Sequence, residues 1–207
     1  MDLLFNTFVV LFIVIDPIGI AAVFMVLLHG ADRIYQRRTA IKSTALATVI
    51  LLVFFFIGDE LLHVLGIDIA AFRIAGGILL FLLSIDMVFA RQSGLRSTTA
   101  REQAEAEHRQ DVSVFPLAFP LISGPGAMTT VLLMASSSAT QPTIMFIGIL
   151  LVLLLVLAIT LVSLLLAPSI MYWLGETGAN VISRLFGLIL AALAVQYIVD
   201  GVKTYLA

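Results

Sequence analysis

Two polar interruptions of long apolar runs hold the residue types that could carry chemistry. The first run, VVLFIVIDPIGIAAVFMVLL, has Asp16, Pro17 and Gly19 at its middle, and a later run, FPLAFPLISGPGAMTTVLLM, has Ser123 to Gly126 there. Proline lacks a backbone donor and clashes with the preceding turn, and glycine tolerates non-helical dihedral angles. We therefore expect both helices to break at mid-membrane, each giving two half-helices.

Each expected break offers backbone groups of two polarities. The half-helices after Gly19 and Gly126 would present free N–H groups and positive dipole ends, which suit a carboxylate. The carbonyl groups before the breaks, together with Asp16, would suit an ammonium group or a small cation. This arrangement predicts binding of a zwitterion between the breaks.

Asp16 carries a further expectation, because a charged side chain at the bilayer centre costs about 2.5–3.5 kcal/mol. We expect it to be protonated, paired or ion-bound, and we assign the coupling ion or proton to it. The expected substrate-binding residues belong to the two breaks and to neighbouring polar positions: Asp16, Pro17, Gly19, Ser123, Gly124, Pro125, Gly126, Thr129, Thr130 and Gln196. The two threonines could equally bond to their own helix, and Gln196 could contact only another helix.

Enzymatic and metal chemistry are not expected. The chain has no cysteine, and its 3 histidines lie far apart in the sequence. Asp16 has no acidic partner at the corresponding depth, because the later run has Gly124 there. We predict no catalytic residue, no metal site and no cofactor other than a coupling proton or sodium ion.

The elements that position these residues are membrane spans. The chain has 207 residues, of which 61% are hydrophobic and 12% are charged, whereas soluble domains have about 25% charged residues. A span needs about 20 mostly apolar residues. The sequence therefore predicts an all-α integral membrane protein with six transmembrane helices, near residues 3–28, 40–65, 68–90, 112–136, 143–173 and 181–203.

Basic residues predict the orientation of these spans. With six spans, one side of the membrane carries nine of the 11 basic residues, and the other carries only Arg73 and Lys203. The nine are Arg33, Arg37, Arg38, Lys42, Arg91, Arg96, Arg101, Arg109 and Arg184. The positive-inside rule then places loops 29–40 and 91–111 in the cytoplasm and both termini on the outer face.

A faint internal repeat relates the two halves of the chain. Asp16-Pro17 corresponds to Gly124-Pro125, Val64-Leu65-Gly66 to Trp173-Leu174-Gly175, and RIAGGILLFLL from Arg73 to RLFGLILAALA from Arg184, at separations of 108 to 111 residues. Three spans per repeat make the second copy inverted. We predict a first three-helix repeat over 1–90, a cytoplasmic connecting loop over 91–111 and an inverted repeat over 112–207. Such pairs are typical of secondary transporters.

Other polar and small residues have simpler interpretations. Arg73 and Arg184 are expected to anchor helix ends by extending toward the interface. Asp86 and Asp200 are expected at solvated helix ends, and Gly76, Gly77 and Gly187 at close helix contacts.

Four motifs together resemble one family. DPIG, RIAGGILLF, PLAFPLISGPGAMTT and SRLFGLILAALAVQ resemble the MarC family of bacterial inner-membrane proteins, also called SnatA-type neutral amino acid transporters. The resemblance spans nearly the whole chain. It implies a six-span inverted-repeat carrier for small neutral amino acids such as glycine or alanine, driven by a proton or sodium gradient.

The family signatures fall on the two predicted breaks. The first matches Asp16, Pro17, Gly19 and Phe24, and the second matches Pro120, Gly124, Pro125 and Gly126. One departure concerns the first signature, where the family commonly continues with asparagine and later proline. This chain has Ile20 and Ala22, which bears on substrate preference and the coupling ion.

The sequence therefore predicts a multi-pass inner-membrane symporter for small neutral amino acids that works by alternating access. A channel or exporter for another small solute is the alternative, and a membrane scaffold without a substrate is a third interpretation. The expected partners are the small-molecule substrate and the lipid bilayer. A homo-oligomer is compatible with the sequence, and no nucleic-acid partner is expected, since the 91–111 loop has balanced charge.

Overall fold

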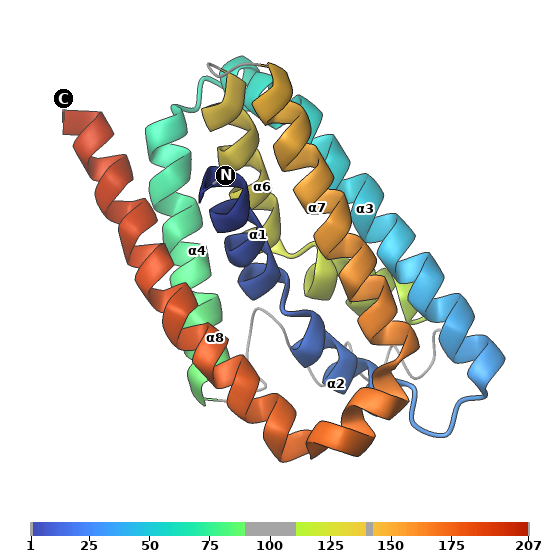
Figure 1. Cartoon of the computed structure of the whole chain (residues 1–207). Helices are drawn as coiled ribbons and strands as arrows, with labels where there is room; N and C mark the ends of the chain where they lie inside the picture. Colours follow the sequence, from blue (N-terminus) through green and yellow to red (C-terminus); the bar gives the residue numbers. More distant parts are fainter. Residues whose placement is uncertain (1, 90–110, 140–142, 207) are drawn as a thin grey trace.

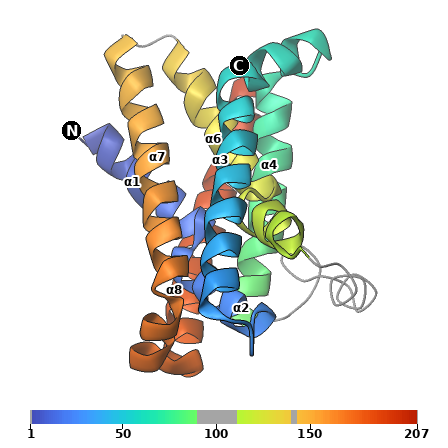
Figure 2. The same cartoon turned by 90° about the vertical axis from the view of Figure 1, so that its right-hand side faces the viewer.

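The computed structural model describes residues 2–89, 111–139 and 143–206, and every regular element in these ranges is helical. Figures 1 and 2 show the helices as one bundle. In chain order they are α1 (Asp2–Ile15), α2 (Pro17–Leu27), α3 (Arg33–Val64), α4 (Ile69–Phe89), η1 (Ser113–Ile122), α6 (Pro125–Ala139), α7 (Thr143–Leu165) and α8 (Ala167–Leu206). Except for Asp111, the predicted connecting loop 91–111 lies outside the described residues.

The described helices suit a membrane. Five spans are long and apolar enough to cross one, and a sixth results if Ser113–Ile122 and Pro125–Ser137 count as one bent span. The axes of this pair differ by 54°. Large apolar side chains are exposed on the bundle surface, for example Val49 at 60% and Leu151 at 61%. The prediction of an all-helical, multi-pass membrane protein is confirmed.

The helix that contains the predicted second span extends beyond it by about two turns. α3 begins at Arg33 rather than near residue 40. Asp32 caps this helix by accepting a hydrogen bond from the Tyr35 amide at 2.6 Å. Because a capped helix can continue through charged residues, α3 begins before its apolar part.

The predicted fifth span, 143–173, is divided between two helices next to Pro168. α7 ends at Leu165, and the chain continues as α8 from Ala167. Pro168 lies in the first turn of α8. An N–H group has no acceptor within the helix at this position, so proline is tolerated there. α8 then turns at Gly175, which has a φ of 64°, before its long Thr177–Leu206 part. Figure 1 shows the early part of α8 crossing one end of the bundle.

α4 and α8 pack closely in opposite directions. A Cβ atom on Gly77 would lie 2.9 Å from the carbonyl oxygen of Ala194, and one on Gly201 would lie 2.9 Å from that of Ala70. A Cβ atom on Gly187 would lie 3.1 Å from a backbone carbonyl oxygen of α4. The predicted role of Gly77 and Gly187 in close helix packing is confirmed.

The pair α1 and α2 is the most enclosed of the single spans. Of its most apolar segment, 56% is buried inside the protein, against 33% or less for each of the other single spans. α7 packs against both helices, and α8 packs against α2. On the other side, α3 packs against η1 and α6, and α4 packs against α6. Any polar group at the junction of α1 and α2 therefore lies in the core.

An ion pair joins α3 to the residues that begin η1. The Lys42 ammonium group contacts the Asp111 carboxylate, which also accepts a hydrogen bond from the Ser113 amide at 3.1 Å. The hydrogen bond from Lys42, together with those from Ser113, holds the pKa of Asp111 below its ordinary value. This cluster fixes the start of η1 against α3.

Candidate functional site

The first candidate break lies between α1 and α2. α1 ends at Ile15, α2 begins at Pro17, and Asp16 between them has a left-handed backbone with φ 54° and ψ 66°. Among the described residues, Asp16 is the one non-glycine residue with positive φ. This conformation is unfavourable for a residue with a Cβ atom, and strain of this kind is concentrated at functional sites. The side chain of Asp16 is completely buried.

The two carboxylate oxygens of Asp16 have different partners. Oδ1 accepts a hydrogen bond from the Gly19 amide at 3.0 Å and so caps α2. Oδ2 accepts a hydrogen bond from the Ser183 hydroxyl of α8, also at 3.0 Å. Because the Gly19 amide is already bonded, it is not a free N–H group in this conformation. Asp16 instead joins the break to a helix from the other half of the chain.

Gly19 is fitted closely to this carboxylate. A Cβ atom there would lie 2.1 Å from Oδ2 of Asp16 and 2.7 Å from Oγ of Ser183. The absence of a side chain at Gly19 therefore lets the Asp16 carboxylate occupy its site. Sequence reasoning missed Ser183, although this hydroxyl directly precedes Arg184 in the SRLFG motif.

The second candidate break lies between η1 and α6. Phe115 and Phe119 have extended backbones inside η1, and each precedes a proline, a position where the helical region is disfavoured. Ser123 is completely buried and donates its hydroxyl to the Ala118 carbonyl at 2.7 Å. A Cβ atom on Gly124 would lie 2.3 Å from the Pro120 carbonyl oxygen. The chain thus folds back tightly on itself before α6.

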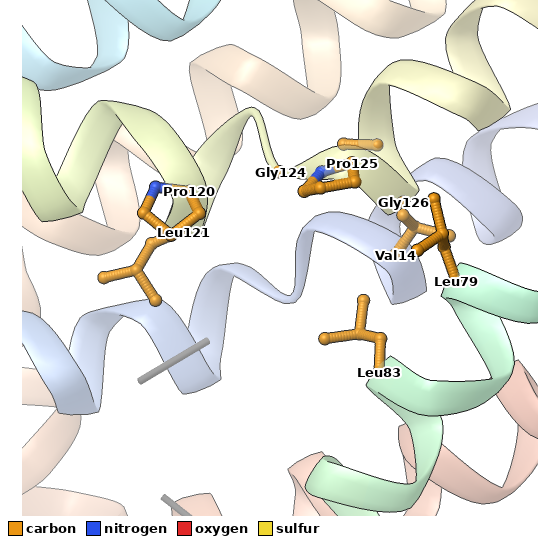
Figure 3. Close-up of a pocket in the computed structure, with 9 residues that line it drawn as sticks. Val14, Leu79, Leu83, Pro120, Leu121, Gly124, Pro125 and Gly126 are labelled. Atoms are coloured by element: carbon orange, nitrogen blue, oxygen red, sulfur yellow. The ribbon is translucent and has the colours of Figure 1, made fainter. Parts of the chain in front are cut away.

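A small cavity adjoins the start of α6. It has a volume of about 20 Å³, and its lining comes from α1, α4, η1 and α6: Val14, Leu79, Leu83, Pro120, Leu121, Gly124, Pro125, Gly126 and Ala127. Figure 3 shows Gly124, Pro125 and Gly126 between Pro120 and the leucines of α4. Such a volume holds about one water molecule. The first-turn amides of a helix have no hydrogen-bond acceptor within the helix. The α6 amides near Gly126 can therefore donate hydrogen bonds to an anion.

The remaining predicted residues divide between the core and the surface. Thr129 and Thr130 are buried on α6, and a Cβ atom on Gly76 would lie 1.8 Å from Cγ2 of Thr129. Gln196 is exposed and donates a hydrogen bond to Asp200 at 2.9 Å. The structure therefore brings the residues of the two breaks and the two threonines into the bundle core, but Gln196 lies apart from them.

Two further signature positions and one departure lie in the core. Phe24 is 1% exposed, and Pro120 lines the small cavity. Ile20 is also 1% exposed, so this departure from the expected asparagine supplies no polar side-chain atom to the core. Within the described part of the chain, no cluster of three or more histidine, aspartate or glutamate residues could hold a metal ion.

Comparisons with known proteins identify the family. Residues 1–206 match the family described as MarC family integral membrane protein. A UPF0056 membrane protein of Methanocaldococcus jannaschii is 37% identical over 93% of this chain and 92% of its own length. The UPF0056 membrane protein YvbG of Bacillus subtilis is 34% identical over 96% of this chain and 93% of its own. The UPF0056 inner membrane protein YhgN of Escherichia coli is 31% identical over 100% of this chain and 99% of its own length.

No solved structure is significantly similar to this chain. The match over nearly the whole sequence, and relatives of the same length, confirm the resemblance drawn from the four motifs. The chain belongs to the MarC family of integral membrane proteins.

Proposed function

We propose that this protein is a secondary transporter of small neutral amino acids such as glycine and alanine, coupled to a proton or sodium ion, that works by alternating access. The observation that carries the proposal is Asp16: a completely buried carboxylate at a left-handed break, bonded both to its own half-helix and to Ser183 of α8. A buried ionisable group at a helix break in a membrane protein favours an ion or substrate pathway. The substrate class rests on the resemblance in the signature motifs.

An inverted repeat is part of the proposal, and the helix contacts support it. Exchanging α1 with η1, α2 with α6, α3 with α7 and α4 with α8 converts the strongest helix contacts into one another. Thus α4 packs against α6 as α8 packs against α2, and α3 contacts η1 and α6 as α7 contacts α1 and α2. The antiparallel packing of α4 and α8 is expected for corresponding helices of inverted halves.

Substrate would bind between the two breaks. Its carboxylate would accept hydrogen bonds from the α6 amides near Gly126, and its ammonium group would lie near Asp16 and the carbonyl groups of the breaks. The present cavity of about 20 Å³ at Gly126 is too small for an amino acid. Binding therefore requires the breaks to separate, and the contact between Asp16 and Ser183 would change when α2 moves relative to α8.

Asp16 would also couple transport to the ion gradient. A proton on Oδ2 would turn this oxygen from an acceptor into a donor, and the Ser183 hydroxyl would have to reorient. A sodium ion would instead take both carboxylate oxygens as ligands. Either event changes the bond between the two halves, which links ion binding to the rocking motion. No enzymatic step and no other cofactor is part of the proposal.

We place the protein in the cytoplasmic membrane, with both termini on the outer face. The distribution of basic residues supports this orientation, and the relative YhgN is named an inner membrane protein. Substrate and lipid are then the partners of the protein.

A channel or exporter for another small solute would use the same breaks. Counterflow separates these alternatives, since only a carrier exchanges internal unlabelled substrate for external labelled substrate. Proteoliposomes loaded with unlabelled alanine or glycine should take up the labelled amino acid with saturable kinetics. Absence of counterflow with both amino acids, in vesicles that contain folded protein, would refute the proposed function.

A further inference from the structure

A second, much larger cavity lies at the end of the bundle where α1 begins. Its volume is about 350 Å³, against about 20 Å³ at the break. Five helices line it: the first part of α1, the first half of α4, the second half of α6, the first part of α7 and the last part of α8. By the distribution of basic residues this is the outer end of the bundle.

Two opposite charges line this cavity. Arg73 comes from α4 and Asp200 from α8, and both are half-buried. Among the described residues, the ion pair within 4.0 Å joins Lys42 and Asp111, so Arg73 and Asp200 do not pair with each other. Both charges instead face shared space, together with the polar side chains of Asn6 and Thr7.

The Asp200 carboxylate is held in place by a neighbour. Gln196 Nε2, one turn earlier on α8, donates a hydrogen bond to Asp200 Oδ1 at 2.9 Å. This bond orients the carboxylate and limits its rotation. Gln196 thereby acts as a positioning residue of this cavity rather than as part of the breaks.

The cavity suits a molecule with one positive and one negative end. A guanidinium group forms short, charge-assisted hydrogen bonds with a carboxylate, often through two parallel bonds. A carboxylate accepts similar bonds from an ammonium group. A ligand with a single charge satisfies only one of the two residues and leaves the other charge in the cavity without compensation.

We propose that this cavity is an outer binding site for the zwitterionic α-amino acid group, in which Arg73 binds the carboxylate and Asp200 binds the ammonium group. The inference rests on the proposed function and adds a second site to it. Gly126 and Leu133 are seven residues apart on α6, a rise of about 10 Å. The outer site and the break are therefore arranged in series along one helix, and substrate is captured at the first before it reaches the second.

The absence of native cysteines makes the cavity directly measurable. Ser137 lines it and is exposed, so a Ser137→Cys variant reports access through its reaction with a membrane-impermeant thiol reagent added outside proteoliposomes. Alanine should slow this reaction. The half-protecting concentration is the alanine concentration that halves the rate of this reaction. Arg73→Gln and Asp200→Asn should each raise it about tenfold or more, because each removes a charge-assisted bond.

Matched variants and ligands make the test specific. Arg73→Lys and Asp200→Glu retain the charge and should shift protection less, and Arg184→Gln, an arginine outside the cavity, should leave it unchanged. Arg73→Gln should weaken protection by propionate but not by alaninamide, and Asp200→Asn should do the reverse. An unchanged rate of Ser137→Cys labelling without ligand shows that each variant is folded.

Counterflow in the same vesicles separates this proposal from the proposed function. If wild-type vesicles exchange alanine and the half-protecting concentration is the same in Arg73→Gln, Asp200→Asn and wild type, the outer site is refuted while the transporter stands. Equal weakening by Arg184→Gln would also refute it. If wild-type vesicles show neither exchange nor protection, the proposed function fails, and the outer site fails with it.

Discussion

Replacement of Gly19 by alanine tests the geometry of the first break. The new Cβ atom would lie 2.1 Å from Oδ2 of Asp16 and 2.7 Å from Oγ of Ser183, far inside the roughly 3.5 Å at which non-bonded heavy atoms are most stable. The Asp16 carboxylate would have to leave its position. It would then lose both its bond to the Gly19 amide and its bond to the Ser183 hydroxyl.

The expected destabilisation follows from these two bonds. Loss of a helix N-cap costs about 1 kcal/mol, and loss of a hydrogen bond to a charged group costs about 1.5–3 kcal/mol. Alanine returns about 1 kcal/mol through its better helix propensity. Gly19→Ala should therefore destabilise the protein by about 1.5–3 kcal/mol, whereas glycine-to-alanine changes in ordinary helices stabilise.

The assay is thermal unfolding of purified protein, combined with alanine counterflow. Gly178→Ala is the matched control, because its closest neighbour would be a leucine Cβ at 3.3 Å. In an Asp16→Ala background, Gly19→Ala should destabilise the protein less than in the wild type, since the carboxylate that it displaces is gone and only the Ser183 hydroxyl remains close. Wild-type stability and counterflow in Gly19→Ala, or additive effects of the two changes, would refute this account of the break.

Three further changes test other contacts. Ser183→Ala should lower the thermal midpoint and slow counterflow, because Oδ2 loses the α8 hydroxyl; counterflow equal to wild type would contradict a role for this bond. Gly76→Ala should lower the thermal midpoint, since its Cβ would lie 1.8 Å from Cγ2 of Thr129, and an unchanged midpoint would show that α4 and α6 are not in close contact. The hydrogen bond from Lys42 lowers the pKa of Asp111. The ion pair therefore stabilises the fold at pH values above the ordinary carboxyl pKa of 3.8, and this stabilisation is lost as the pH falls below 3.8. The thermal midpoint of wild type should therefore fall more than that of Asp111→Asn between about pH 5 and pH 3, and parallel curves would contradict the contribution of the ion pair with Lys42.

Local sequence signals predict much of this fold. The apolar runs predict the spans, and the glycines of α4 and α8 predict their close packing. The prolines in FPLAFP predict an irregular segment, because the residue before a proline avoids helical backbone. Each of these effects depends only on a residue and its immediate neighbours.

The partners of polar side chains could not be predicted in this way. Ser183 meets Asp16 across 167 residues of sequence, and this contact depends on how α8 packs against α2. The hydrogen bond from the Gly19 amide to Asp16 depends on the left-handed backbone of Asp16. Most aspartates do not adopt this conformation. Arg73 and Asp200 likewise line one cavity only because α4 and α8 converge.

The most direct test of the central claim is gradient-driven accumulation of labelled alanine in proteoliposomes, with the wild type compared with Asp16→Asn. Asparagine keeps an oxygen that can accept from the Gly19 amide, but it cannot take up a proton or supply a carboxylate to a cation. An imposed proton or sodium gradient should drive saturable accumulation by the wild type. Asp16→Asn, when folded and inserted in the vesicles, should lose this accumulation. Gradient-driven accumulation by Asp16→Asn equal to that of the wild type would contradict the coupling role of Asp16, and absence of alanine and glycine flux in both proteins would contradict the assignment as an amino acid transporter.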